Sequence, residues 1–470
     1  MASYYDDLLR LCGFEVEEIE KERERIDNAF RKLEIGPEDM EIANNWVRMN
    51  HDVTLTSVRK LLGAWLKELI DLAIAKDEGK KIIYYGFPAM VRPGMLIKAS
   101  SENVYCACPD ALLCHTMGQI FNKLTPILEA GEENGLPPGH ALCSLWQIKV
   151  GALAKGMIPA PDLAIASSYF CDMGSKADDL LAERYGTPII YIDGSMDSAW
   201  GDYPEYLPER VEFLGAELNH LFDMVKEVAG VEITQDAWDK TESFIRSYYG
   251  RLGRITQLMN ADPVPVGSAA IELATILPPA CTGRGVSEAS KALAILTMEI
   301  QTRIDKGIGV VEKGAPRVMQ FIGNFSDASI SRMIENAGLA VPVTFFTAPT
   351  PRVEPTTSYS TMGEKMADSE MRQGLYHSSY GLIKRTEMAM KHTDLDGLIE
   401  NYLFNCRPVA IISHSCKKWI EENTGIPTLS LENDIYDTRS YSAAAMRTRL
   451  ETFAEMLKAK KASAGIKGHK

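Results

Sequence analysis

The chain has 470 residues, of which 46% are hydrophobic and 24% are charged, and its formal net charge is −14. This length exceeds one ordinary hydrophobic core and predicts two or three domains. The acidic balance disfavours a nucleic-acid partner, because an acidic surface repels the phosphate backbone. The sequence contains no run of 18 apolar residues, which is the pattern that would predict a membrane span. Residues 1–30 also contain no apolar core of the kind found in a signal peptide. We therefore expect a cytoplasmic protein.

The first part of the chain changes from a helical to an alternating pattern. Residues 1–79 show helical periodicity with many charges and predict a helical N-terminal segment. Residues 80–205 then alternate between strand and helix patterns and predict a first α/β domain. Its predicted elements are a strand at 80–88, a helix at 144–157, a strand within 159–171, a helix at 174–186 closed by Gly186, and a strand at 187–193.

The second part of the chain returns to strands after a long helical stretch. Residues 206–310 carry apolar residues at three- and four-residue spacing, so we expect a helical middle segment. Residues 311–470 predict a second α/β domain, a polar loop at 349–361 and a final helix. The fold class is therefore α/β, with two Rossmann-like parallel-sheet domains. Strand-like runs of the second domain lie within 315–325, 342–349, 408–416 and 426–434.

Two segments of the chain repeat one pattern. Residues 163–193 and 409–434 each run through an apolar strand, a serine-containing loop, a cysteine, a helix stopped near a glycine, and a second strand. In this pattern Cys171 and Cys416 both follow a strand and precede a helix. Ligands of parallel α/β sheets bind at such strand ends, and a helix N-terminus lowers the pKa of a thiol. The alternative is that each cysteine is a small buried apolar residue.

At this point the residues resemble a known family. The segments PAPDLAIASSYFC, ISHSCKKW and ENDIYDTRSYSAAAMRTRLETFAEML are similar to blocks of the 2-hydroxyacyl-CoA dehydratases and ATP-dependent benzoyl-CoA reductases, above all their large subunits. The resemblance spans residues 80–460. It implies a [4Fe–4S] cluster in the cleft between the two α/β domains, with one iron left open. The cysteines that match the family's three ligands are Cys143, Cys171 and Cys416.

The resemblance also implies a reaction and two partners. The expected enzyme is an iron–sulfur lyase of anaerobic metabolism that removes water from an (R)-2-hydroxyacyl-CoA through a ketyl radical. It is expected to pair with a smaller homologous cluster-binding subunit as a heterodimer and to receive its electron from a separate ATP-dependent activator. Consistently, this chain has no G-x-x-x-x-G-K-[ST] motif for ATP phosphates.

Three other functions stay open at this point. One is a benzoyl-CoA-reductase-type subunit, an oxidoreductase that reduces an aromatic acyl-CoA. Another is a double-cubane-type electron-transfer or reductase protein that binds no acyl-CoA. The last is a two-domain α/β protein whose cysteines are only packing residues. The sequence does not choose the acyl chain.

The stretch VYCACPDALLCHTMG at 104–118 carries Cys106, Cys108 and Cys114. Their spacing is not a standard zinc or ferredoxin pattern, and they match no ligand position of the family. We expect them to be structural or to pack near the site. The alternative is that they hold a second iron–sulfur unit.

Several polar residues are weaker candidates. His414 flanks Cys416 and is a candidate catalytic residue that donates a hydrogen bond or a proton. The alternative is a loop histidine whose ring nitrogens are hydrogen-bonded and have no catalytic role. Ser167 and Ser168 are candidates for hydrogen bonds to sulfur. In the block at 434–439 we expect Asp434, Asp437 and Arg439 to form an ion pair that locks the strand–loop junction.

Overall fold

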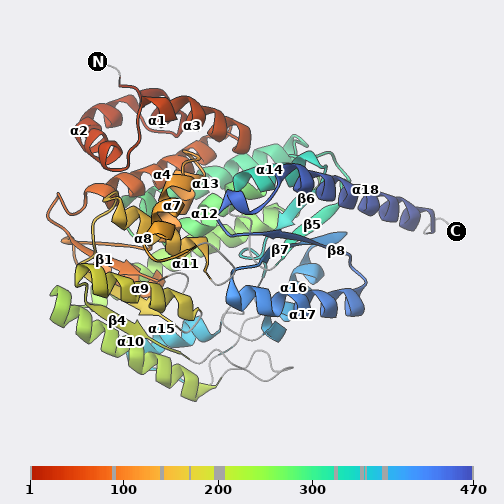
Figure 1. The fold of residues 1–470 in the computed structure, drawn as a ribbon. Coiled ribbons are helices and arrows are strands. Elements are labelled where there is room, and N and C mark those ends of the chain that lie inside the picture. The colour runs from red at the N-terminus through yellow and green to blue at the C-terminus, as the bar shows by residue number, and fades with distance from the viewer. Residues whose placement is uncertain are drawn as a thin grey trace.

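The N-terminal segment forms a layer of helices. The computed structural model describes residues 3–86, 91–137, 142–168, 171–194, 207–321, 327–349, 354, 357–372 and 379–467. Figure 1 shows the first three helices at the edge of the molecule opposite α10 and α15, while α4 packs inward against α13. These helices are α1 (Asp6–Leu11), α2 (Val16–Lys32), α3 (Pro37–Asn50) and α4 (Thr56–Ile74).

The first α/β domain is built on four parallel strands in the order β2-β1-β3-β4. The strands are β1 (Lys81–Tyr85), β2 (Val104–Ala107), β3 (Leu163–Ser167) and β4 (Ile189–Ile192). The predicted strands at 80–88, 159–171 and 187–193 are thus confirmed where the structure describes them; residues 87, 88, 169 and 170 lie outside the described residues. The helices are α5 (Val91–Ser100), α6 (Pro109–Leu113), η1 (Cys114–Gly118), α7 (Thr125–Glu133), α8 (Ser144–Ala154) and α9 (Asp172–Tyr185).

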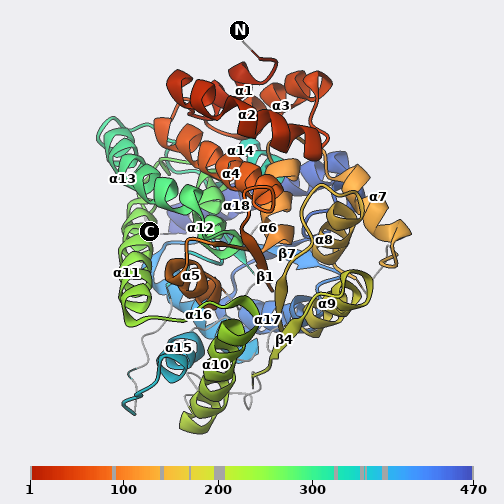
Figure 2. The same cartoon turned by 90° about the vertical axis from the view of Figure 1, so that its left-hand side faces the viewer.

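The middle helices join the two halves of the molecule. The segment at 206–310, predicted to be helical, contains α10 (Pro208–Ala229), α11 (Gln235–Leu258), α12 (Ser268–Ala280) and α13 (Arg284–Asp305), and residue 206 lies outside the described residues. Helix α12 contacts α6 in the first α/β domain and also contacts β6 and α14 in the second. Figure 2 shows α11, α12 and α13 grouped beside α4 and α5. The hydrophobic core of this group is continuous with that of the N-terminal helices and the first sheet.

The second α/β domain repeats the strand order of the first, as β6-β5-β7-β8, and all its pairings are parallel. Its sheet carries a separate apolar cluster on each face. Among the described residues no helix is both long and apolar enough to cross a membrane. The elements are β5 (Arg317–Phe321), α14 (Ala328–Asn336), β6 (Ala340–Val343), α15 (Met362–Met371), α16 (Ser379–His392), β7 (Gly397–Leu403), α17 (Arg407–Thr424), β8 (Thr428–Asn433), η3 (Thr438–Ser440) and α18 (Ala443–Lys467).

The predicted strand at 408–416 is wrong, because these residues lie inside α17. The strand of this unit is β7, which ends at Leu403, and the helix begins soon afterwards. The predicted helix stops are confirmed, since Gly186 and Gly425 end α9 and α17 in the left-handed conformation that glycine adopts without strain. The repeated unit is therefore β3-α9-β4 and β7-α17-β8, and its second copy begins earlier than the sequence indicates.

Candidate functional site

Four cysteines stand immediately before the first residue of a helix: the buried Cys108 before α6, and three that are partly exposed. Cys143 is the N-cap residue of α8, Cys171 that of α9, and Cys406 that of α17. All three have the extended backbone that is usual at this position. The first N–H groups of a helix have no partner within it and carry a partial positive charge. Each sulfur therefore lies at a helix end that favours a thiolate.

Cys171 and Cys406 are equivalent residues of the repeated unit. The first follows β3 and the second follows β7, and these two strands hold the same place in the order of their sheets. Both strands neighbour the point at which the strand order reverses, where open α/β sheets bind their ligands. The repeat noted in the sequence is thus real, but its second cysteine is Cys406.

Exposure separates these three cysteines from the other six. Cys143, Cys171 and Cys406 are partly exposed. A partly exposed thiol is accessible to a ligand from solvent, whereas a buried structural thiol often behaves as a small apolar residue. The buried cysteines are Cys12, Cys106, Cys108, Cys114, Cys281 and Cys416.

The three partly exposed thiols influence one another across the boundary between the two α/β domains. Burial raises the pKa of Cys143, and negative charges on Asp434, Cys406 and Cys171 raise it further, while the Leu145 N–H lowers it in part. Burial also raises the pKa of Cys406 to about 12, with added contributions from Cys171 and Asp434 and an opposing one from the Val409 N–H. Neither the Cys143 sulfur nor the Cys406 sulfur forms the side-chain hydrogen bond that caps a helix N-terminus. A bound cation or cluster would supply the positive charge that these thiolates need.

Cys416 lies elsewhere in the second domain. Its side chain is buried in an apolar cluster with Met319 and Ile420, and its Sγ donates to the Ser379 carbonyl at 3.4 Å. After burial, the group that most affects the pKa of this thiol is Glu400 of β7. Among the described contacts none joins Cys416 to Cys143 or Cys171. The structure thus brings two of the three predicted ligands together, with Cys406 as their neighbour; ligation by Cys416 stays a prediction.

Sequence reasoning missed Cys406, although a local signal was present. Pro408 stands in the first turn of α17, where proline is favoured, and Cys406 precedes that turn. Helical spacing then continues through the buried side chains of Ser413, Cys416 and Ile420.

The first turns of α8 and α9 are packed directly against each other. A Cβ atom on Gly174 would come within 2.9 Å of the Trp146 ring, so only glycine leaves room for this indole. Trp146 Nε1 and Ser167 Oγ are buried, and neither has a hydrogen-bond partner within the described part of the chain. Buried donors usually have partners, and two such donors near the thiols suit an acceptor such as sulfide sulfur. The donor set thus fits a cluster chemically.

The described residues contain no group of three or more His, Cys, Asp or Glu side chains already arranged to hold a metal ion. The chemistry and exposure of Cys143, Cys171 and Cys406, and the two donors beside them, are what suit the site to a cluster.

A buried charged layer lies behind Cys143. Cys108 donates to Asp110 Oδ1 at 2.7 Å, and Asp110 Oδ2 lies 3.9 Å from Lys149 Nζ. Lys149 also forms a buried ion pair with Asp178. Cys114 is electrostatically coupled to Asp110 and to Cys143. Burial raises the pKa of its thiol, and the negative charges of these two residues raise it further. The structure therefore buries Cys108 and Cys114 near Cys143, and their role as packing residues stays a prediction.

The remaining candidates lie in both α/β domains. His414 is exposed on α17, and no described contact joins it to the three partly exposed thiols, so its catalytic role stays a prediction. Ser168 donates its N–H to the Ile192 carbonyl at 3.1 Å and thereby serves the first sheet. The predicted ion pair forms between Arg439 and Asp437, and Arg439 also pairs with Glu132 of α7 at 2.6 Å. Asp434 is hydrogen-bonded instead.

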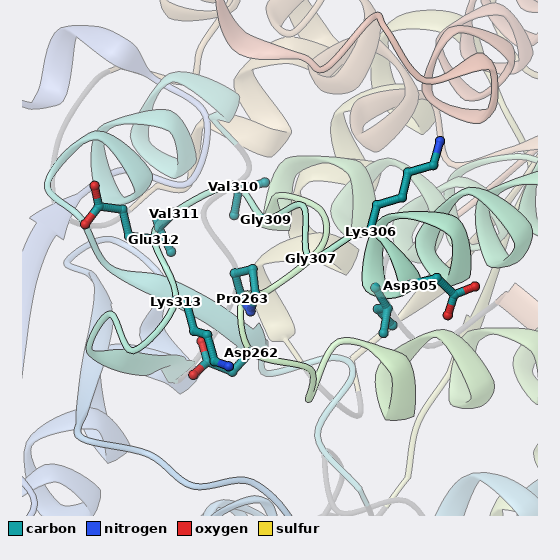
Figure 3. Close-up of a pocket in the computed structure, with 11 residues that line it drawn as sticks. Asp262, Pro263, Asp305, Lys306, Gly307, Gly309, Val310, Val311, Glu312 and Lys313 are labelled. Carbon is teal, nitrogen blue, oxygen red and sulfur yellow. The ribbon is translucent and has the colours of Figure 1, made fainter.

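A separate open hollow of about 880 Å³ lies on another part of the surface. Figure 3 shows Gly309 and Val310 passing beside Pro263 at its wall, where the chain leaves α13 for the second domain. None of the residues that line this hollow is a cysteine. The hollow therefore shares no residue with the site of Cys143, Cys171 and Cys406. The lining residues are Asp262, Pro263, Ile304, Asp305, Lys306, Gly307, Gly309, Val310, Val311, Glu312 and Lys313.

The two α/β units share one strand order, and their thiols at helix N-termini influence one another across the domain boundary. These features define a class of two-domain protein that is suited to hold a metal or cofactor by sulfur ligands. Residues 106–457 match the family described as 2-hydroxyglutaryl-CoA dehydratase, D-component, which is most of the chain. The chain belongs to this family.

Individual relatives agree with this family. The chain is 19% identical over 408 residues to the (R)-2-hydroxyisocaproyl-CoA dehydratase alpha subunit of Clostridioides difficile, covering 82% of this chain and 92% of the relative. It is 20% identical to the (R)-phenyllactyl-CoA dehydratase alpha subunit of Clostridium sporogenes, covering 69% and 77%. It is 22% identical to a benzoyl-CoA reductase subunit of Thauera aromatica, covering 70% and 80%. These are enzyme subunits of the two kinds that the sequence resembles.

Proposed function

We propose that this chain is the large subunit of a 2-hydroxyacyl-CoA dehydratase, and that it holds a [4Fe–4S] cluster and removes water from an (R)-2-hydroxyacyl-CoA. Family membership and the dehydratase relatives support the reaction class. The observation that carries the cluster proposal is the set of three partly exposed N-cap thiols, Cys143, Cys171 and Cys406. Three thiolates leave one iron of such a cluster open to substrate.

A bound cluster would be held by Cys143, Cys171 and Cys406 and would supply one-electron and Lewis-acid chemistry, as loss of the 2-hydroxyl group through a ketyl radical of the substrate requires. The residues of the chain prepare the site for this chemistry. The helix N-termini behind the three cysteines offset thiolate charge. Trp146 Nε1 and Ser167 Oγ are available to donate hydrogen bonds to sulfur. Asp110, Lys149 and Asp178 form a buried charged layer behind Cys143.

The third ligand is the point on which sequence and structure differ. Cys406 is supported by its partial exposure, its N-cap position and its electrostatic link to Cys143 and Cys171. Cys416 is supported by its match to the sequence pattern alone. The two cysteines lie at the start and in the middle of one helical segment, which makes them a matched pair for mutation.

The test is the iron and sulfide content of the chain after anaerobic purification, with single serine variants of Cys143, Cys171, Cys406 and Cys416. We expect about four irons per chain in the wild type, as a [4Fe–4S] cluster requires. We expect their loss in the first three variants and their retention in Cys416→Ser. Loss in Cys416→Ser with retention in Cys406→Ser would restore the ligand set predicted from sequence.

Other outcomes would change the proposal itself. About eight irons that also depend on Cys106, Cys108 or Cys114 would indicate two clusters and the double-cubane function. An iron-free wild-type chain would overturn the cluster. Four irons with no turnover of any 2-hydroxyacyl-CoA would overturn the dehydratase reaction while leaving the cluster in place.

The proposal includes two protein partners. The relatives are themselves named as subunits, which supports a second subunit for this chain; we propose a smaller homologous protein with its own cluster. We propose that a separate ATP-dependent activator delivers the low-potential electron. Turnover that needs both added proteins and ATP would support this assembly, and turnover by the isolated chain with a chemical reductant would contradict it.

A second candidate function is reduction of an aromatic acyl-CoA. It is favoured by the 22% identity to the benzoyl-CoA reductase subunit, which extends over 367 residues. The two functions share the cluster, so metal analysis does not separate them. Parallel assays with 2-hydroxyacyl-CoA substrates and with benzoyl-CoA decide between them. Loss of water indicates the dehydratase, and uptake of electrons by the ring indicates the reductase.

A further inference from the structure

The carboxylate of Asp434 joins the two α/β domains at the cysteine site. Asp434 follows β8 in the second domain and is 8% exposed. Its Oδ1 accepts a hydrogen bond from Ser144 Oγ of α8 in the first domain. The same oxygen accepts the backbone N–H groups of Tyr436 at 2.8 Å and Asp437 at 3.0 Å, which fix the carboxylate in its own loop.

The other oxygen of Asp434 holds the residue beside Cys406. Oδ2 accepts a hydrogen bond from Asn405 Nδ2, and the same amide donates to the Leu142 carbonyl at 2.9 Å. Leu142 and Ser144 are the two chain neighbours of Cys143, and Asn405 precedes Cys406. Asp434 and Asn405 therefore hold Cys143 from both sides and tie it to Cys406.

Asp434 is also a buried charge near these thiols without a cation of its own. Within the described chain, no Lys, Arg or His forms an ion pair with it, and its partners are hydroxyl, amide and backbone groups. Its carboxylate is hydrogen-bonded to Ser144 and Asn405, the chain neighbours of Cys143 and Cys406, so its charge lies beside both cysteines. A buried negative charge in such surroundings is poorly screened by water.

We propose that Asp434 is a positioning residue, which holds Cys143 and Cys406 at a fixed separation across the domain boundary and lowers the reduction potential of a cluster bound there. The inference rests on the proposed function and deepens it. Adding an electron beside a fixed negative charge is unfavourable, so the charge lowers the potential. A low potential is what the reduction of a thioester carbonyl demands.

The positioning part is tested on the chain without metal. Dibromobimane links two thiols only when they are close, and the linked peptides that contain Cys143 and Cys406 are measured by mass spectrometry. We expect a clear yield in the wild type and a several-fold lower yield in Asp434→Ala. The matched control is Asp437→Asn. It removes a negative charge from the same loop, but that charge forms an ion pair with Arg439. An unchanged yield in Asp434→Ala would overturn the positioning role.

The charge part is tested on the iron-loaded chain with Asp434→Asn, which keeps the size of the side chain. We expect a higher midpoint potential in a redox titration followed by electron paramagnetic resonance. A tenfold larger equilibrium constant for reduction corresponds to about 59 mV for a one-electron couple. A potential equal to that of the wild type, or an equal rise in Asp437→Asn, would overturn the charge role.

The two tests also separate this inference from the proposed function. If the wild-type chain binds no iron, the proposed function fails, while the cross-linking yield still decides the positioning role. If iron binds and Asp434→Asn leaves both potential and iron content unchanged, the function stands and the charge role fails, while the cross-linking yield decides the positioning role. Thermal unfolding of each variant shows whether it is folded.

Discussion

The ring of Trp146 occupies the space that a side chain on Gly174 would need, with 2.9 Å between the ring and a Cβ built on that glycine. This contact joins the first turn of α8 to the first turn of α9. It thereby sets the relative positions of Cys143 and Cys171, which precede these two turns. We expect Gly174→Ala to force the buried indole aside and to lower the free energy of unfolding by about 1 to 3 kcal/mol.

The measurement for Gly174→Ala is the midpoint of urea unfolding, together with iron content. Gly250→Ala is the control, because Gly250 lies in α11 and a Cβ atom added there would have no other atom within 4 Å. Alanine is the better helix former, so this control should be neutral or slightly stabilising. Equal effects of the two substitutions would show that the Trp146 contact is unimportant.

Lys149 is a buried cation held between two buried carboxylates. Burial alone would lower its pKa, but Asp178 and Asp110 outweigh burial and raise it. Lys149→Met leaves both carboxylates without their cation, and we expect a loss of about 3 to 5 kcal/mol in unfolding free energy. Lys226→Met is the matched control because its pair with Glu232 is exposed, so we expect a change within about 0.5 kcal/mol. Similar losses in both variants would contradict the buried-pair argument.

Glu68 of α4 predicts a pH dependence of stability. Burial, followed by the charge of Asp71, raises its pKa from 4.5 to about 7, although it accepts hydrogen bonds from Gly285 N–H and Tyr105 Oη. Between these two pH values the folded chain keeps a proton that the unfolded chain has lost. The contribution of Glu68 to stability is therefore complete below pH 4.5 and is lost as the pH rises to about 7.

This dependence is measured as the urea midpoint between pH 4.5 and 7 in the wild type and in Glu68→Gln. We expect the wild type to lose about 1.4 kcal/mol per pH unit relative to the variant within this window. Glu455→Gln is the control, because Glu455 is an exposed residue of α18. Parallel pH profiles for the wild type and Glu68→Gln would refute the prediction.

The cysteines predict an order of chemical reactivity in the reduced, metal-free chain. Burial raises the pKa of Cys106 and that of Cys406 alike to about 12, so accessibility rather than pKa sets this order. We expect iodoacetamide at pH 8 to modify the partly exposed Cys143, Cys171 and Cys406 first, because the thiolate is the reactive form and must be reached. Peptide mass spectrometry measures the rates, and full modification in urea is the control. Equal rates for Cys106 and Cys143 in the folded chain would contradict this order.

Much of the architecture was predictable from local pattern. Alternating apolar runs and helical spacing indicated two α/β domains around a helical middle segment, and Gly186 and Gly425 marked the true ends of α9 and α17. These features depend on residues close in sequence, which is the range over which periodicity and helix termination act.

Strand β7 was not predictable in the same way. Its run GLIENYL contains Glu400 and Asn401, which a strand of a buried sheet seldom carries. Both residues are buried, and the Glu400 carboxylate accepts hydrogen bonds from Ser413 of α17 and Ser430 of β8. Those donors come from other elements. The neighbouring run PVAII is short and apolar, and such a run does not distinguish a strand from a buried helix.

The sequence alone indicated the class of protein, its two α/β units, and Cys143 and Cys171 as candidate ligands. Only the tertiary structure showed that Cys406 influences these two thiols, and that Asp434 and Asn405 tie the two domains together there. The physical reason is that secondary structure follows from neighbours along the chain. A site between domains depends instead on the strand order of two sheets and on hydrogen bonds between residues hundreds of positions apart.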